Sequence, residues 1–156
     1  VFEQCKKENI NIKLFQQCTE TQTEKLSKIY KNLNLNFALF NFTNNISDYF
    51  SKTELVITRA GSSVTAELIN CNIPFITIPY PYAADSHQDK NATFFEKKGY
   101  SFSVKEAEVS KKLFSLIESF YKDKKLLDKM IEKQKKHSDK EAFLKINKVI
   151  KNLINE

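Results

Sequence analysis

Residues suited to phosphate binding follow an apolar segment that ends at Thr58. They lie in a short run of basic and small residues: Arg59, Ala60, Gly61, Ser62 and Ser63. We expect Gly61 to permit a tight turn and a helix to begin near Ser62 or Ser63. The amides and the macrodipole at a helix N-terminus favour a phosphate, and small residues let it approach closely. An ordinary strand–turn–helix with a serine N-cap shares this pattern, so spacing alone leaves both interpretations open.

Glu67 lies one turn into the expected helix, and helix capping does not account for it. A capping box requires Glu or Gln three residues after the N-cap, but those positions hold Thr65 and Ala66 for the two serines. A carboxylate placed here can accept hydrogen bonds from two ribose hydroxyls, as acidic groups do in dinucleotide sites. Glu67 therefore strengthens the nucleotide interpretation.

A second polar cluster follows the next apolar segment. Pro79 and Pro81 stiffen the exit from an expected strand, and a new helix is expected to begin near Asp85. His87 and Gln88 at that helix start have the groups to hydrogen-bond sugar hydroxyls. Asp85 and Gln88 also have capping-box spacing, and without further information we favour the cap.

A third candidate lies at Phe42 and Thr43, where an aromatic residue at a strand end is able to cover a base. Such aromatic residues are more often part of the core. The sequence contains no GxGxxG motif, P-loop, metal-ligand cluster or Ser-His-Asp arrangement. We therefore expect no cofactor and no metal.

The elements that must position these residues alternate along the chain. Apolar and β-branched runs predict strands at 10–15, 37–42, 55–58, 75–78 and 100–104. Helical periodicity appears between and after them. It is carried by Leu26, Ile29, Tyr30 and Leu33; by Val64, Leu68 and Cys71; by Leu113, Leu116, Ile117 and Phe120; by Leu127, Met130 and Ile131; and by Phe143, Ile146, Val149, Ile150, Leu153 and Ile154. The alternation predicts an α/β fold, a Rossmann-like parallel sheet with flanking helices.

The length of 156 residues fits one domain, and no apolar run approaches the roughly 18 residues of a membrane span. The sequence starts without Met, without a secretory signal and apparently inside a helix, so we expect an N-terminally truncated chain. Three widely spaced cysteines, Cys5, Cys18 and Cys71, are expected to be buried or inert thiols in a reducing compartment.

The net charge of +6 is concentrated near the C-terminus. Residues 1–96 carry 9 basic and 10 acidic groups, whereas residues 97–156 carry 16 basic and 9 acidic groups. A basic helical surface suits nucleic acid, an anionic membrane or a solvated face. Because no nucleic-acid motif accompanies it, we expect no nucleic-acid partner.

The two main clusters resemble the C-terminal, donor-binding domain of glycosyltransferase family 28, GT-B enzymes that make lipid II at the bacterial inner membrane. That domain carries an R-[SA]-G-x-x-[TS]-x-x-E run, a proline-containing strand exit and a D-x-x-Q-x-x-N-A helix start. Here the corresponding residues are Arg59-Ala60-Gly61 with Glu67, residues 78–82, and Asp85 with Gln88 and Asn91-Ala92. The resemblance spans residues 1–156 in element order, with 107–156 as C-terminal helices of the same domain, and its specificity lies in residues 54–99.

The resemblance implies a role for each candidate residue. Glu67 would hold the ribose hydroxyls of UDP-GlcNAc, and Gln88 and His87 would contact the GlcNAc hydroxyls. The uracil would be flanked by Phe42 and Thr43. The diphosphate would face Ser62, Ser63 and Val64, with Arg59 either contributing there or tying the loop to a carboxylate. Two positions depart from the family's pattern: His87 stands where Gln is frequent, at the sugar contact, and Val64 stands where a hydroxyl residue is frequent. The Val64 departure shifts any side-chain phosphate contact to Ser63 or Thr65.

The resemblance also implies an activity that this chain does not complete alone. The family transfers GlcNAc, with inversion, to undecaprenyl-diphospho-N-acetylmuramoyl-pentapeptide, and the acceptor and catalytic base belong to a first domain absent here. No catalytic residue is therefore expected in this chain, and the basic helices would help it sit peripherally on the cytoplasmic, anionic face of the inner membrane. Two alternatives stay open: the donor-binding subunit of a related two-subunit transferase, and a non-catalytic basic module that binds membrane or nucleic acid.

Overall fold

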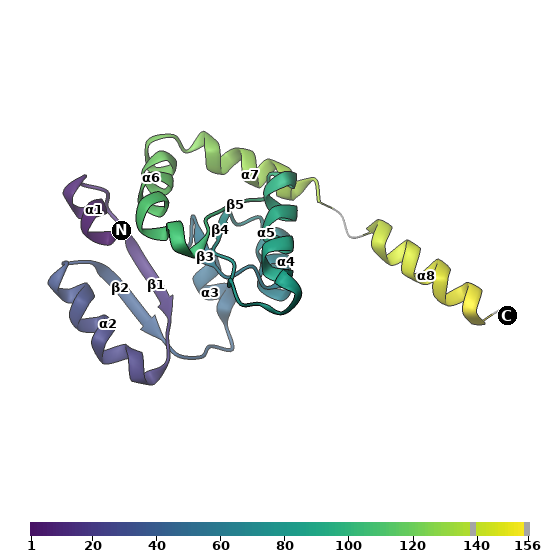
Figure 1. Ribbon diagram of the computed structural model, residues 1–156, viewed down its shortest axis with the longest axis horizontal. Helices are drawn as coiled ribbons and strands as arrows, with labels where there is room; N and C mark the ends of the chain where they lie inside the picture. Colours follow the sequence, from purple (N-terminus) through teal and green to yellow (C-terminus); the bar gives the residue numbers. More distant parts are fainter. Residues whose placement is uncertain (138–139, 155–156) are drawn as a thin grey trace.

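The computed structural model describes residues 1–137 and 140–154 as an α/β fold (Figure 1). Five parallel strands form two sheets, and the strands are β1 (Lys13–Gln17), β2 (Asn36–Phe40), β3 (Val56–Thr58), β4 (Phe75–Thr77) and β5 (Ser101–Ser103). β1 pairs with β2, with Phe15 opposite Ala38. The second sheet has the order β3-β4-β5, with Ile57 opposite Ile76 and Ile76 opposite Phe102.

One helix precedes the first strand, and the others lie between and after the strands, as the alternating pattern predicts. They are α1 (Phe2–Lys7), α2 (Glu20–Asn32), α3 (Ile46–Phe50), α4 (Ser62–Asn70), α5 (His87–Lys98), α6 (Val109–Lys122), α7 (Lys125–Lys135) and α8 (Lys140–Ile154), with 3-10 turns η1 (Ala84–Ser86) and η2 (Glu106–Glu108). Gly99 follows α5 with a φ of 73°, a backbone conformation that residues other than glycine rarely adopt. Among the described residues, no helix combines the length and the apolar composition needed to cross a bilayer.

The strand expected at residues 10–15 forms three residues later, as β1. Ile10 lies in the turn that precedes it, where its N–H donates to the Cys5 carbonyl at 2.8 Å. Its side chain is buried there, so an apolar residue at this position contributes to the core without belonging to the ladder. Of the three thiols expected to be buried or inert, Cys5 and Cys18 are buried and Cys71 is exposed.

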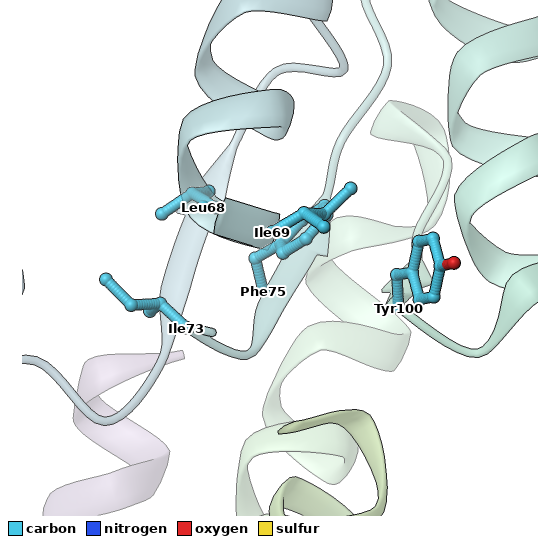
Figure 2. Close-up of a cluster of buried hydrophobic side chains, with 5 residues drawn as sticks. All are labelled: Leu68, Ile69, Ile73, Phe75 and Tyr100. Carbon is cyan, nitrogen blue, oxygen red and sulfur yellow. The ribbon is translucent and has the colours of Figure 1, made fainter. Parts of the chain in front are cut away.

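The core consists of two clusters on opposite faces of the β3-β4-β5 sheet. Phe75 and Ile76 are consecutive in β4 and therefore point to opposite faces. Phe75 packs with Leu68 and Ile69 of α4 and with Ile73 and Tyr100, as Figure 2 shows. Ile76 packs in the other cluster, whose remaining members are Val104, Leu113, Phe120 and Met130. Helices cover both faces of this sheet, as near-continuous apolar strands require.

Helix α8 carries the periodicity expected of it, but its apolar face is not part of the core. Leu144, Ile146, Val149, Ile150, Leu153 and Ile154 are all exposed, and the helix extends beyond the rest of the fold in Figure 1. Phe143 belongs to the same stripe, and its side chain lies outside the described residues. Periodicity predicts the helix and its apolar face. It does not predict whether another part of the fold packs against that face.

Candidate functional site

The helix start expected near Ser62 or Ser63 is the N-terminus of α4. Gly61 is its N-cap, with φ −73° and ψ 141°, and no side chain caps the helix. The prediction that Gly61 permits a tight turn is wrong. Its backbone is extended, and residues of any type adopt these angles. A Cβ at Gly61 would meet only Val64 Cγ1, at an ordinary 3.9 Å. The serine-cap alternative is also excluded, and the first amides of α4 keep the donors that helix geometry leaves unpaired.

The first turn of α4 divides into exposed and buried side chains. Ser62 and Ser63 are exposed, and the turn contains no acidic residue that would repel an anion. Thr65 is fully buried, and its hydroxyl donates to the Gly61 carbonyl at 2.7 Å. Val64 packs against the Leu68 cluster, so only its backbone N–H is available at the helix start. Ser63 and Thr65 were the two hydroxyl residues expected to contact phosphate in place of Val64. The Ser63 hydroxyl is accessible, whereas the Thr65 hydroxyl is buried and bonded to the Gly61 carbonyl.

Glu67 lies on the exposed surface of α4, one turn after Ser63. Residues separated by four positions share a helix face, so the Ser63 hydroxyl and the Glu67 carboxylate point to the same side. No ion pair within residues 1–137 and 140–154 includes Glu67. The surface therefore joins anion-binding amides to an acceptor of hydroxyl protons one turn away.

Arg59 braces the loop before α4 against two other segments. Its guanidinium donates to the Glu106 carboxylate at 2.5 Å and to the Ile78 carbonyl at 3.3 Å. It also lies over the Tyr80 ring, 5.4 Å from the ring centroid. Of the two roles expected for Arg59, the structure contains the tie to a carboxylate, and contact with a diphosphate stays a prediction.

The capping box expected at Asp85 and Gln88 is wrong. Helix α5 begins at His87, after a 3-10 turn in which Asp85 and Ser86 have φ values of 50° and 51°. These positive φ values turn the chain between the two helical segments, so Asp85 does not cap α5. The Gln88 carbonyl oxygen Oε1 instead accepts the N–H of Tyr80 at 2.9 Å, which leaves its amide N–H₂ as a donor. His87 is exposed, with Nδ1 2.8 Å from the Ala84 carbonyl.

Asn91 connects the two main loops, a role that its side chain alone did not indicate. Its Nδ2 donates to the Ala60 carbonyl at 3.0 Å, so α5 holds the loop between β3 and α4. Glu106, the partner of Arg59, was also missed, because 47 residues separate the two in sequence. Asn91 stands in the D-x-x-Q-x-x-N-A motif, which was the available signal for it. No local pattern marks Glu106.

Phe42 and Thr43 lie after β2, in the other sheet. Phe42 is 77% exposed, and the Thr43 hydroxyl accepts the Asn45 N–H at 3.0 Å. Thr43 lines a hollow of about 310 Å³ together with Phe15 and Tyr49. Within the described part of the chain, no hydrogen bond or ring contact links Phe42 or Thr43 to the loops after β3 and β4. The structure thus brings the Arg59–Gly61 loop, α4 and α5 together, and leaves these two residues apart.

The chemistry of this surface is recognition of an anion and of hydroxyl groups. Helix-start amides suit phosphate, and Glu67 suits vicinal hydroxyls. Gln88 and His87, at the start of α5, add further groups that can form hydrogen bonds. Among residues 1–137 and 140–154, His, Cys, Asp and Glu side chains form no group of three or more able to hold a metal ion.

Comparisons with known proteins relate the whole domain to one enzyme family. The model of the glycosyltransferase family 28 C-terminal domain matches residues 1–146. Two relatives are each named UDP-N-acetylglucosamine--N-acetylmuramyl-(pentapeptide) pyrophosphoryl-undecaprenol N-acetylglucosamine transferase. The Pelagibacter ubique protein is 38% identical over 67% of this chain and 29% of its own length. The Rickettsia bellii protein is 37% identical over 72% of this chain and 33% of its own length.

The crystal structure of Acinetobacter baumannii MurG superimposes on 88% of this chain with a TM-score of 0.76, at 23% identity, and 40% of the MurG chain is covered. At this identity the likeness concerns the fold, and it agrees with the α/β architecture expected from the sequence. The chain spans about a third of the length of the two curated relatives.

Proposed function

Because the chain belongs to the glycosyltransferase family 28 C-terminal domain family, we propose that it binds UDP-GlcNAc as the donor half of an inverting transferase. The whole enzyme would transfer GlcNAc to undecaprenyl-diphospho-MurNAc-pentapeptide in peptidoglycan synthesis. The names of the Pelagibacter and Rickettsia relatives support this substrate pair. Since the chain covers a third of their length, the acceptor and the general base would be held by the remaining part of the enzyme, and this chain alone would be inactive.

The uncapped N-terminus of α4 is the observation that supports donor binding best. The diphosphate would accept hydrogen bonds from the amides of Ser62, Ser63 and Val64, where neither a capping side chain nor an acidic residue competes. The Ser63 hydroxyl would add a further donor. As the glycosidic bond breaks, negative charge grows on the departing diphosphate, and these fixed amides would stabilise it without reorganisation.

The other residues would select the donor. The Glu67 carboxylate would accept hydrogen bonds from the two ribose hydroxyls. It lies one turn after Ser63, on the same face of α4. The free amide of Gln88 and the exposed ring of His87 would contact GlcNAc hydroxyls from the start of α5. Arg59 would act mainly through the loop, by holding Ala60 and Gly61 where the phosphate approaches. Phe42 and Thr43 would flank the uracil from the loop after β2, which requires that loop to approach α4 in the bound enzyme.

The lysines of α8 suggest a contact with the membrane surface. Lys148 and Lys151 of α8 lie on the helix side opposite Ile146, Val149 and Leu153, an arrangement suited to an anionic bilayer surface. The protein would be peripheral on the cytoplasmic face of the inner membrane. Sedimentation with vesicles containing one-third phosphatidylglycerol, lost at high salt and absent with phosphatidylcholine alone, would support this location. Equal retention on both vesicle types would argue against it.

Isothermal titration with UDP-GlcNAc tests donor binding directly. We expect Glu67→Ala to weaken binding by roughly 10–100-fold, because hydrogen bonds to a charged group are worth about 1.5–3 kcal/mol. Glu132→Ala in α7 is the matched control, since Glu132 is also an exposed helical carboxylate. Circular dichroism must show both variants folded. An unchanged affinity in the folded Glu67→Ala variant would sink the ribose assignment, and retention on DNA without any response to UDP would favour the basic-module alternative.

A further inference from the structure

The loop between β4 and η1 carries two tyrosines that the core does not use. Tyr80 is 43% exposed and Tyr82 is 83% exposed. Their rings meet edge to face, with 5.7 Å between the centroids and an angle of 73° between the ring planes. Among the described residues, Tyr80 is the only one whose ring contacts the Tyr82 ring. Burial in the fold therefore does not account for an aromatic residue at position 82.

The backbone that carries the two tyrosines is stiff. Pro79 and Pro81 fix their own φ angles, and Pro81 also disfavours helical angles at Tyr80. The Ala83 N–H donates to the Tyr80 carbonyl at 3.2 Å, which closes a four-residue turn with Pro81 at the position where proline is favoured. A ligand that contacts Tyr82 would therefore lose little affinity to the ordering of this loop.

Tyr80 ties this turn to both loops of the candidate site. The Arg59 guanidinium lies over the Tyr80 ring, 5.4 Å from its centroid, and donates to the Ile78 carbonyl at 3.3 Å. These contacts join the turn to the loop before α4. The Tyr80 N–H donates to Gln88 Oε1 at 2.9 Å, which joins the turn to the start of α5. The position of the Tyr82 ring is thus set by residues that flank the proposed donor site.

The sheet places the turn beside the anion-binding helix start. β3 and β4 are adjacent and parallel, so the segments that follow them emerge at the same edge of the sheet. Helix α4 follows β3 and the tyrosine turn follows β4, and ligands of doubly wound sheets bind at this edge. Because Gln88 Oε1 bonds to the Tyr80 backbone, the remaining amide donors of Gln88 lie next to the turn. A sugar bound by these donors would lie close to the two tyrosines.

An exposed aromatic ring beside an amide donor suits a pyranose. A sugar of gluco configuration carries its hydroxyls around the ring edge and presents C–H groups on its two faces. The amide can bond to the edge, and the negative face of an aromatic ring attracts the C–H groups and repels a phosphate. We propose that Tyr82, held in place by Tyr80, stacks on the GlcNAc ring of the donor, an assignment that rests on the proposed binding of UDP-GlcNAc.

Isothermal titration of the 156-residue chain and its variants with UDP-GlcNAc and with UDP tests this contact, because UDP lacks the sugar. Tyr82→Ala should weaken UDP-GlcNAc binding by about 5–10-fold, the loss expected for roughly 40–50 Å² of apolar surface no longer buried, and should leave UDP binding unchanged. Tyr82→Phe keeps the ring and should bind both ligands as the unaltered chain does. Tyr121→Ala in α6, where the tyrosine is also exposed, is the matched control and should change neither affinity.

Fluorescence gives a second measurement. The chain contains no tryptophan, so Tyr82→Trp introduces a single reporter at the proposed contact. Saturation with UDP-GlcNAc should move its emission to shorter wavelength, because the sugar excludes water from the ring, whereas saturation with UDP should not. An equal emission change with both ligands would overturn the proposal.

The titrations separate the alternatives, once circular dichroism shows that each variant is folded. Equal losses of UDP and UDP-GlcNAc affinity in Tyr82→Ala would place the ring against the nucleotide and overturn the sugar contact. A loss in Tyr82→Phe as large as that in Tyr82→Ala would assign the effect to the hydroxyl and overturn stacking. Undiminished UDP-GlcNAc affinity in Tyr82→Ala would overturn the contact and leave donor binding intact. Failure of the unaltered chain to bind either ligand would overturn the proposed function, and the sugar contact with it.

Discussion

The ion pair between Arg59 and Glu106 decides whether Arg59 acts on the donor or on the loop. We consider Arg59→Ala, Glu106→Gln and the double variant. Both side chains are about half exposed, at 48% and 46%, so their pairing is worth about 0.2–1 kcal/mol despite the 2.5 Å distance. The stacking of Arg59 on Tyr80 adds about 0.5–1 kcal/mol. Arg59→Ala should therefore lower the free energy of unfolding by about 1–2 kcal/mol, and Glu106→Gln by less than 1 kcal/mol.

Donor binding separates the two roles. If Arg59 only braces the loop, Arg59→Ala and Glu106→Gln should each weaken UDP-GlcNAc binding by less than about tenfold, and the double variant should be no worse than Arg59→Ala. If Arg59 contacts the diphosphate, Arg59→Ala should cost roughly 10–100-fold, because a charge-assisted hydrogen bond is worth about 1.5–3 kcal/mol. Glu106→Gln would then release the guanidinium and leave affinity unchanged or higher. The contacts with Glu106, Ile78 and Tyr80 favour the first pattern.

Urea denaturation and isothermal titration on the same four proteins give both quantities. The unfolding measurements form a double-mutant cycle, and we expect a coupling energy of about 0.2–1 kcal/mol between Arg59 and Glu106. Titrations at two salt concentrations check whether the arginine charge reaches the ligand. A large loss of affinity in Arg59→Ala together with intact affinity in Glu106→Gln would refute the bracing role.

Three further predictions concern residues that the structure buries or joins. Gln134 is buried and donates from Nε2 to the carbonyls of Ile73 and Tyr100 at 3.0 and 2.9 Å. Urea denaturation should show Gln134→Glu destabilised by about 3–5 kcal/mol at pH 7 and less at pH 4.5, because protonation removes the unpaired buried charge. Burial raises the pKa of Tyr30, whose hydroxyl donates to Gln16. A raised folded-state pKa contributes stability below the ordinary value near 10 that is lost as pH rises through the folded pKa. Tyr30→Phe should cost about 1 kcal/mol at pH 7 and nearly nothing at pH 11, measured by the same denaturation; an equal cost at both pH values would contradict this. Asn91→Ala should weaken UDP-GlcNAc binding severalfold in titration by releasing the Ala60 carbonyl, whereas the exposed Lys90→Ala should leave it unchanged.

The α/β class was predictable because it follows from local patterns. Alternating apolar runs and helical periods locate the five strands and most of the helices to within a few residues, although α3 was not predicted. The helical crossovers between strands make the strands parallel. The motif residues were also placed correctly relative to these elements, with Gly61 and Ser62 at a helix start. The predicted single parallel sheet appears as two parallel sheets with a seam between them. Periodicity does not report which strands are neighbours, so this division was not predictable from it.

Capping shows where local rules fail. Asp85 and Gln88 have the spacing of a capping box, yet Gln88 bonds to the Tyr80 N–H because positive φ values at Asp85 and Ser86 redirect the chain. Sequence spacing describes the options of a side chain, and the path of the backbone decides among them. The same holds for α8, whose apolar stripe is real but whose exposure depends on what packs against it.

By itself the sequence determined three features: a helix start with small residues suited to an anion, a carboxylate at Glu67 that capping does not explain, and the family resemblance. All three depend on residue types at short separations. Only the tertiary structure decided that Arg59 braces a loop through Glu106, that Thr65 is buried while Ser63 is accessible, and that Asn91 joins α5 to Ala60. These contacts link residues far apart in the chain or depend on which side of a helix meets the core. Packing of the whole chain sets both, and no local spacing encodes them.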